Sequence, residues 1–173
     1  PRLAALGDPA YLDSLGFGVD ARSTLRIVLS TAADQTAVTH GRLQREWQEN
    51  GRRYFEYVAE RKVWPVFYVT SGRYQLARDT WTNGKQDVTI EIYYHPAHAY
   101  NVAAYMATAK RSLDYFTREF APYQYSHLRI MEYPRYRGAV KALPGGVAYS
   151  ERSGWIANLA NLDNIDYTTI HET

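Results

Sequence analysis

The residues best suited to chemistry in this sequence are two neighbours, His171 and Glu172. They fit the first part of the pattern H-E-x-x-H, in which two histidines one helical turn apart bind the same metal ion. In that pattern His171 is the first ligand, and Glu172 is the base that accepts a proton from metal-bound water. The second histidine is absent from the sequence. The pair alone therefore leaves open a chance dipeptide on a helix surface.

A second candidate, Glu151, lies in the run Pro144 to Ile156, about twenty residues before His171. This order resembles the aminopeptidase N-like zinc peptidases (gluzincins), in which a G-x-M-E-N-type strand precedes the H-E-x-x-H helix by a similar interval. The similarity is closest to the bacterial branch in which the peptidase domain follows ABC-type permease segments. It covers the chain from about Trp64 onward, through His95-Pro96, Asn101, Leu113-Asp114-Tyr115-Phe116, Phe120 to Tyr125 and Leu128 to Pro134.

The resemblance implies a role for Glu151 in holding the substrate. A carboxylate at the end of the cleft can pair with the free α-ammonium of a peptide and so fix its position. Ala148, Tyr149, Ser150, Glu151 and Arg152 correspond to the G-x-M-E-N positions, and only the glutamate matches strictly. In the family this glutamate lies on the edge strand of a mixed sheet. The alternative for Glu151 is a solvated carboxylate or a salt-bridge partner of Arg152.

The resemblance further implies that the chain is a fragment of a zinc-dependent aminopeptidase-like protein, which removes N-terminal residues from peptides. Zinc is expected in the full-length parent, and neither bound zinc nor peptidase activity is expected in this incomplete piece. The expected partner is a peptide with a free amino terminus. The fragment is expected to be soluble, and the parent to lie in the bacterial cell membrane. The alternative function is a non-catalytic β-rich binding or scaffold module associated with a membrane transporter.

Two other groupings of chemically capable residues are weaker candidates. His95 and His98 have a spacing that could bind a metal ion on a helix, but Pro96 lies between them and no carboxylate is near them in sequence. Glu132 and Glu151 could form the carboxylate pair of a glycosidase, but the sequence does not fix their separation.

Composition limits the remaining classes of function. The 173 residues are 46% hydrophobic and 22% charged, as in globular proteins, with no cysteine. The net charge is only +2, and Lys and Arg form no sustained basic block, so no nucleic-acid partner is expected. No apolar run approaches the roughly twenty residues of a membrane-spanning helix.

The first half of the sequence predicts antiparallel strands. Thr24 to Ser30 alternates with a period of two. Asn50-Gly51 supplies a type I′ turn within a hairpin from Leu43 to Val58. Thr82 to Lys85 connects the strands of a second hairpin, from Tyr74 to Tyr94. We expect the aromatic residues of these hairpins to pack across the strands.

The second half predicts one amphipathic helix, from about His98 to Arg118, because apolar residues recur there at intervals of three and four. A strand follows at Leu128 to Tyr133. The segment from Arg135 to Gly146 is predicted as a loop. Further strands are expected at Val147 to Ser150 and Trp155 to Asn158, and a final helix near Asp163 to Asp166.

These elements predict an α+β fold in two parts. Residues 1–95 form a β-rich portion, the edge of an all-β domain. Residues 96–173 form the start of a thermolysin-like peptidase domain with one long amphipathic helix. A truncated domain leaves apolar surface without cover, so we expect self-association or a rearranged C-terminal end.

Overall fold

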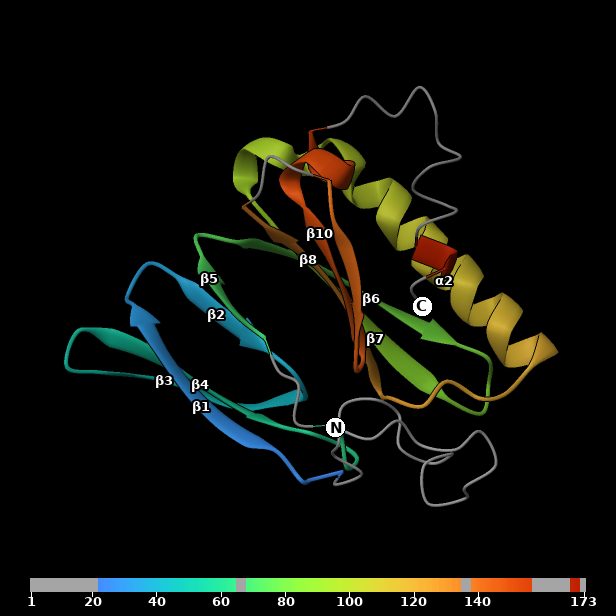
Figure 1. Cartoon of the computed structure of the whole chain (residues 1–173), viewed down its shortest axis with the longest axis horizontal. Helices are drawn as coiled ribbons and strands as arrows, with labels where there is room; N and C mark the ends of the chain where they lie inside the picture. Colours follow the sequence, from blue (N-terminus) through green and yellow to red (C-terminus); the bar gives the residue numbers. More distant parts are fainter. Residues whose placement is uncertain (1–21, 65–67, 135–137, 157–168, 172–173) are drawn as a thin grey trace, which may run out of the picture.

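The computed structural model describes residues 22–64, 68–134, 138–156 and 169–171. Figure 1 shows them as stacked sheets with one long helix. The strands are β1 (Arg26–Ala32), β2 (Thr36–Thr39), β3 (Arg42–Glu49), β4 (Arg52–Val58), β5 (Val69–Gly72), β6 (Gln75–Thr82), β7 (Asp87–Tyr94), β8 (His127–Tyr133), β9 (Val140–Leu143) and β10 (Gly146–Ser150). The helical segments are η1 (Pro96–Asn101), α2 (Val102–Glu119) and η2 (Glu151–Trp155).

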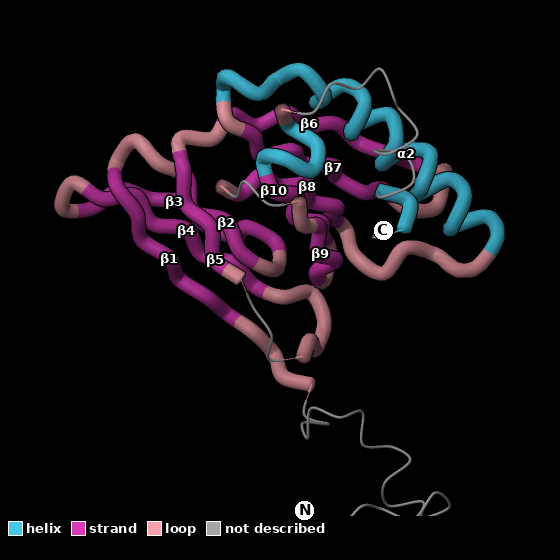
Figure 2. Tube along the Cα trace, turned by 45° about the horizontal axis from the view of Figure 1, so that its top comes forward, coloured by secondary structure: helices cyan, strands magenta, loops and turns pink. Residues whose placement is uncertain are grey.

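A five-stranded mixed sheet in the order β6-β7-β8-β10-β9 is the centre of the molecule. Strands β7, β8 and β10 are parallel, and the edge strands β6 and β9 run antiparallel to their neighbours. Helix α2 covers one face of this sheet, as Figure 2 shows. Every residue of β10 is buried because both faces of the sheet are covered, which is typical of parallel strands.

The other face of this sheet meets the front of the chain, where β2 pairs with β5 and β1, β4 and β3 form a separate sheet. Successive residues of β2 point to opposite sides. Val38 packs against Tyr93 and Met131 of the five-stranded sheet, while Ala37 packs against Phe55 and Tyr57 of the three-stranded sheet. The small β2–β5 ribbon therefore joins the two larger sheets.

Both predicted hairpins are confirmed. Asn50 and Gly51 have φ values of 49° and 71°, as a type I′ turn requires, and they close the β3–β4 hairpin at the pair Glu49 and Arg52. The second hairpin, β6–β7, turns around Gly84 with φ of 81°. In both hairpins, residues with positive φ lie in the turn and so help to set the register of the two strands.

The structure differs from the sequence prediction at three places. The predicted helix is divided into η1 and α2, because Asn101 at their border has non-helical backbone angles (φ −111°, ψ 0°). His98 (φ −116°, ψ 31°) forms a kink within η1. The predicted loop from Arg135 to Gly146 contains strand β9, whose four residues are too few to show a clear period. Trp155, predicted in a strand, ends the π-helical segment η2.

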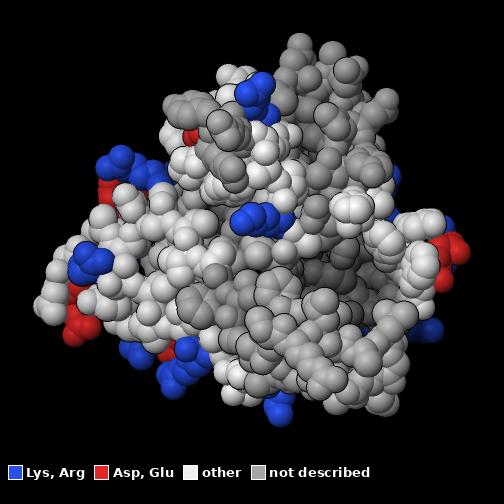
Figure 3. All heavy atoms as spheres, viewed as in Figure 1, with Lys and Arg blue, Asp and Glu red and all other residues white. Residues whose placement is uncertain are grey.

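Other predictions fall partly or wholly outside the described residues. The final helix near Asp163 to Asp166 lies outside them, and a helical turn is described at 169–171. The predicted division at 95/96 passes through the five-stranded sheet, directly after β7. No helix within the described ranges is long and apolar enough to cross a membrane. On the face drawn in Figure 3, acidic and basic side chains lie beside one another around the three-stranded sheet.

Candidate functional site

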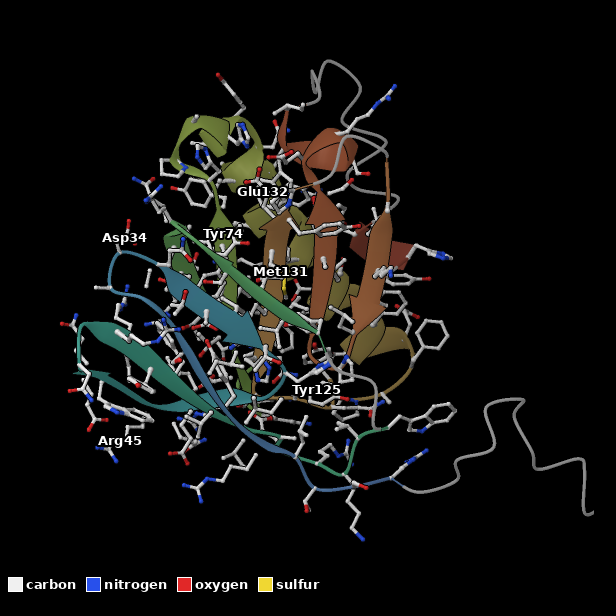
Figure 4. All side chains as sticks on the ribbon, turned by 60° about the vertical axis from the view of Figure 1, so that its left-hand side comes forward. Asp34, Arg45, Tyr74, Tyr125, Met131 and Glu132 are labelled. Carbon is white, nitrogen blue, oxygen red and sulfur yellow. The ribbon has the colours of Figure 1, made fainter. Side chains whose placement is uncertain are left out.

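The carboxyl ends of the three parallel strands bring together three side chains with metal-binding chemistry. His98 lies in η1, which follows β7. Glu132 is near the end of β8, and Glu151 directly follows β10. One potential ligand atom from each of these three residues lies within 4.8 Å of the other two. Figure 4 shows Glu132 at this end of the sheet, above Tyr74 and Met131. We call this group the His98–Glu132–Glu151 cluster.

Glu132 is the fixed centre of the cluster. Its side chain is only 3% exposed. Oε1 is hydrogen-bonded to Nδ1 of His98, and Oε2 accepts a hydrogen bond from the backbone N–H of His95 at 2.6 Å. The hydroxyl of Tyr74 donates to the carbonyl oxygen of Glu132 at 2.9 Å, which holds the strand from the opposite face. The segment 95–98 therefore positions the carboxylate, and Tyr74 holds the backbone that carries it.

The cluster holds more negative charge than its described partners neutralise. Among the described side chains, no Lys or Arg forms a salt bridge with Glu132 or Glu151, and the imidazole of His98 is the group paired with Glu132. The effect extends to Tyr74: burial raises the pKa of its phenol, and the charges of Glu132 and Glu151 raise it further. The nearby hydroxyl of Thr70 opposes this shift.

A buried hydroxyl lies at the border of the cluster. The ring of Tyr105 is fully buried, 4.9 Å from the ring of Tyr149 and 4.7 Å from that of Trp155. Its hydroxyl is directed at Gly154, where an added Cβ would lie 1.7 Å from the oxygen. This hydroxyl has no hydrogen-bond partner among the described atoms. Burial raises the pKa of Tyr105, as do the neighbouring Tyr149 and Glu132.

The structure corrects the interpretation of the two histidines near Pro96. Sequence proximity suggested that no carboxylate accompanies them, but Glu132 reaches them from β8, across the fold. His95 contributes its backbone N–H to Glu132, while its ring Nδ1 accepts a hydrogen bond from Ala97 N at 3.2 Å. His98 alone faces the carboxylate with its imidazole. The spacing of the histidines drew attention to them, but only the sheet topology supplies their partner.

His171 lies at the other end of β10. It lines a hollow that also includes Gly145 and Gly146, at the start of that strand, together with Leu113 and Phe116 of α2. The turn that carries it lies beside α2 in Figure 1. Glu151 follows the last residue of β10, and a five-residue strand spans roughly 16 Å. Glu151 is not among the residues that line this hollow, and the expected approach of Glu151 to His171 across one cleft stays a prediction. Glu172 lies outside the described residues.

The other predicted substrate-binding residues, Ala148, Tyr149 and Ser150, make contacts with other residues of the same chain. Ala148 packs near Val38 on the face opposite α2. The hydroxyls of Tyr149 and Thr169 lie 2.7 Å apart, and the hydroxyl of Ser150 accepts from Ala139 N at 3.1 Å. All three predicted residues are at most 6% exposed. In this arrangement their side chains support the fold and present little surface to a ligand.

Zinc bound through His171 requires further ligands beside it. Within the ranges that the structure describes, the group of three His, Asp or Glu side chains close enough to hold an ion is the His98–Glu132–Glu151 cluster, which excludes His171. The described residues therefore do not assemble a metal site around His171.

The fold is similar to that of several solved peptidases. Aminopeptidase A of Legionella pneumophila, solved with aspartic acid, matches 86% of this chain with a TM-score of 0.75 and 13% identity. An M1 zinc metallopeptidase from Deinococcus radiodurans matches 82% with a TM-score of 0.64 and 16% identity. A two-domain M1 zinc metallopeptidase variant bound to L-arginine matches 83%, with a TM-score of 0.64 and 15% identity. The chain shares the fold of M1-type zinc metallopeptidases.

The match covers only part of those proteins. The chain spans 19% of the Legionella protein and 33% of each of the other two. No protein-family model matches the sequence, and no curated protein matches it. The likeness therefore establishes a mixed, sheet-rich fold with few helices.

The resemblance noted in the sequence leads us to expect a substrate-facing glutamate on the edge strand of the sheet. The edge strand here is β9, and Glu151 follows β10, one strand further in. The only charged residue of β9 is the exposed Lys141. When Gly138 is placed at the glycine of G-x-M-E-N, Lys141 falls at the glutamate. This second register was missed because the segment was predicted as a loop, although the pair Gly138-Ala139 is a signal for it.

Proposed function

We propose that this chain forms the scaffold portion of a zinc aminopeptidase-like protein. The single observation that supports this function is the fold, which matches 86% of the chain to a solved aminopeptidase. In this proposal the chain supplies the end of a β-rich domain and the first sheet and helix of a thermolysin-like domain. His171 is the first zinc ligand and Glu172 the general base. The remaining ligands come from residues that follow in the parent protein.

The proposal uses Glu151 differently from the sequence-based expectation. Glu151 follows the last residue of β10, whereas His171 lines a hollow with Gly145 and Gly146 at the start of that strand. A peptide amino terminus held near His171 requires another carboxylate. In this proposal a carboxylate nearer to His171 binds the substrate's ammonium group, and Glu151 belongs to the cluster with His98 and Glu132.

One observation favours the second candidate, a non-catalytic module from the same family. Lys141 is exposed on the edge strand, in the register where a peptidase would carry an acid. A cationic side chain repels the α-ammonium of a peptide, so a parent with Lys141 facing its cleft would bind free amino termini poorly. This candidate predicts a folded protein without aminopeptidase activity.

Hydrolysis of aminoacyl 4-nitroanilides by the longest natural polypeptide that contains this chain separates the two candidates. The peptidase proposal predicts zinc-dependent hydrolysis that a chelator removes. Replacement of the base in Glu172→Gln should lower kcat by about 10²–10⁴-fold. The matched control is Glu119→Gln, an exposed glutamate at the end of α2. A zinc-loaded protein no faster than its Glu172→Gln variant would refute the peptidase proposal and favour the non-catalytic module.

A further inference from the structure

We propose that His98, Glu132 and Glu151 bind one divalent transition-metal ion, at a site separate from His171. This inference does not depend on the proposed peptidase function, because it uses residues at the opposite end of the sheet. The ion would have one imidazole and two carboxylates as protein ligands, with water completing its coordination.

The ligand set and its dimensions suit such an ion. Imidazole is a good ligand for zinc and related ions, and carboxylates accept the same ions as well as manganese. Zinc–ligand bonds are about 2.1 Å long, so two ligands of one ion lie no more than roughly 4.2 Å apart. The three ligand atoms lie within 4.8 Å of one another. Shifts of about 1 Å, with the His98–Glu132 hydrogen bond replaced by bonds to the metal, would bring them onto one ion.

The ligands come from elements whose positions the fold determines. Each follows or ends one of the three parallel strands, and the carboxyl ends of such strands are where ligands commonly bind in α/β sheets. Glu132 is held by the N–H of His95 at 2.6 Å and by the bond from Tyr74 to its carbonyl. Glu151 and His98 are only partly buried, so an ion can reach them from solvent. The site is thus largely built before an ion arrives.

The charge balance also favours a cation. A buried carboxylate is costly unless it is paired and hydrogen-bonded. The single imidazole of His98 can neutralise Glu132 when protonated, but Glu151, within 4.8 Å, is then left without a positive partner among the described residues. A divalent ion neutralises both carboxylates with a neutral imidazole. An internal ion pair of His98 and Glu132 does not account for Glu151.

An independent observation is the buried hydroxyl of Tyr105. It has no exposed surface and no hydrogen-bond partner among the described atoms, and it lies against Gly154 of η2, the segment that begins with Glu151. Glu132 is paired in register with Tyr149, whose ring packs on Tyr105, so the carboxylate and this hydroxyl lie on the same face of the sheet. A water molecule on the ion would provide the partner that the hydroxyl needs.

The test is calorimetric titration of the purified chain, free of any polyhistidine tag, with zinc chloride. The protein carries His171→Ala, so that the proposed peptidase ligand cannot contribute. The proposal predicts one zinc ion per chain. Each of His98→Gln, Glu132→Gln and Glu151→Gln should weaken zinc binding at least about a hundredfold, and Tyr105→Phe about tenfold. Circular dichroism confirms that each variant is folded.

Glu60→Gln is the matched control, because Glu60 also contacts a histidine, His127, at 3.3 Å but belongs to no three-residue cluster among the described residues. Its zinc affinity should be unchanged within about twofold. Co²⁺ is the second probe, and its visible absorption should change in the parent and in Glu60→Gln but not in the triple glutamine variant. Equal zinc affinity of the parent and the triple variant, with no Co²⁺ difference, would overturn the inference. That outcome leaves the peptidase proposal untouched, since His171 is absent throughout.

Discussion

Two glutamates buried in the same sheet, Glu91 and Glu132, are neutralised in different ways. Their side chains are 8% and 3% exposed. Glu91 receives Arg129 at 2.8 Å and Arg78 at 2.7 Å. Glu132 has one imidazole and one backbone N–H, and a second carboxylate lies beside it. The difference separates a carboxylate that two arginines neutralise, which serves the fold, from one that has no arginine partner and can take a metal ion.

The pKa of Glu91 reflects its completed balance. Burial alone would raise this pKa, but the charges and hydrogen bonds of Arg129 and Arg78 outweigh burial and hold it below its ordinary value. Arg129 is itself buried, and it also donates to the carbonyl oxygens of Thr39 and Gly41 at 2.7 and 3.1 Å. Glu91 is therefore part of a network that crosses from one sheet to the next.

The largest effect in the comparison of Glu91 with Glu132 is expected from removal of Arg129. Arg129→Met leaves Glu91 buried without its main partner, so we expect the free energy of unfolding in urea to fall by about 3–5 kcal/mol. Arg78→Met is the control, because the Arg78 side chain is 55% exposed and its pair should contribute only about 0–1 kcal/mol. Equal losses from both variants would contradict a special role for the buried arginine.

Acid should weaken the Glu91 network. Because the folded pKa of Glu91 lies below its unfolded value of about 4.5, the network stabilises the protein above that pH, and the contribution is lost as the pH falls through the folded pKa. At pH 7, Glu91→Gln should be about 1–3 kcal/mol less stable than the parent. Urea unfolding at several pH values should show this difference shrinking below pH 4.5. A difference that grows in acid would reverse the assigned sign.

The contact of Tyr105 with Gly154, beside the His98–Glu132–Glu151 cluster, can be tested by mutation. Gly154→Ala places a methyl group 1.7 Å from the Tyr105 hydroxyl, and we expect a loss of about 1–3 kcal/mol from overpacking. Tyr105→Phe removes that oxygen, so the same alanine should cost much less in its presence. A double-mutant cycle from urea unfolding measures the coupling, and additive losses would show that the hydroxyl does not lie against Gly154.

The smallest change is expected at Glu132 in metal-free protein. Glu132→Gln keeps an acceptor for the N–H of His95 and removes a charge that repels Glu151, so stability should change by no more than about 1 kcal/mol in either direction. Urea unfolding in the presence of a chelator makes the comparison with Glu91→Gln direct. A loss as large as that of Arg129→Met would show that Glu132 is a structural carboxylate like Glu91.

The sequence predicted those parts of the fold that local chemistry determines. Asn50-Gly51 specified one hairpin, Gly84 lies in the turn of another, and the spacing of apolar residues located α2. The four-residue strands β2, β5 and β9 were missed because they are too short to show a period of two. Their pairing depends on contacts with distant segments, which local patterns do not contain.

The candidate site was predictable only in pieces. His98, Glu132 and Glu151 were each noticed, but in separate hypotheses, since 53 residues separate the first from the last. Parallel pairing of β7, β8 and β10 places their carboxyl ends together. The approach of Glu151 to His171 was expected from motif order alone, and order does not specify that β10 runs between them.

Arg129 extends to the loop between β2 and β3, and this contact affects how the protein unfolds. Its guanidinium binds the carbonyl oxygens of Thr39 and Gly41, although it belongs to the other sheet. Separation of strands β1 to β5 from the five-stranded sheet would break these hydrogen bonds. It would also leave Arg129 and Glu91 exposed on the surface that those strands had covered. The described portion of the chain should consequently melt in one calorimetric peak, and a protease should find no stable intermediate in which the front strands alone have opened.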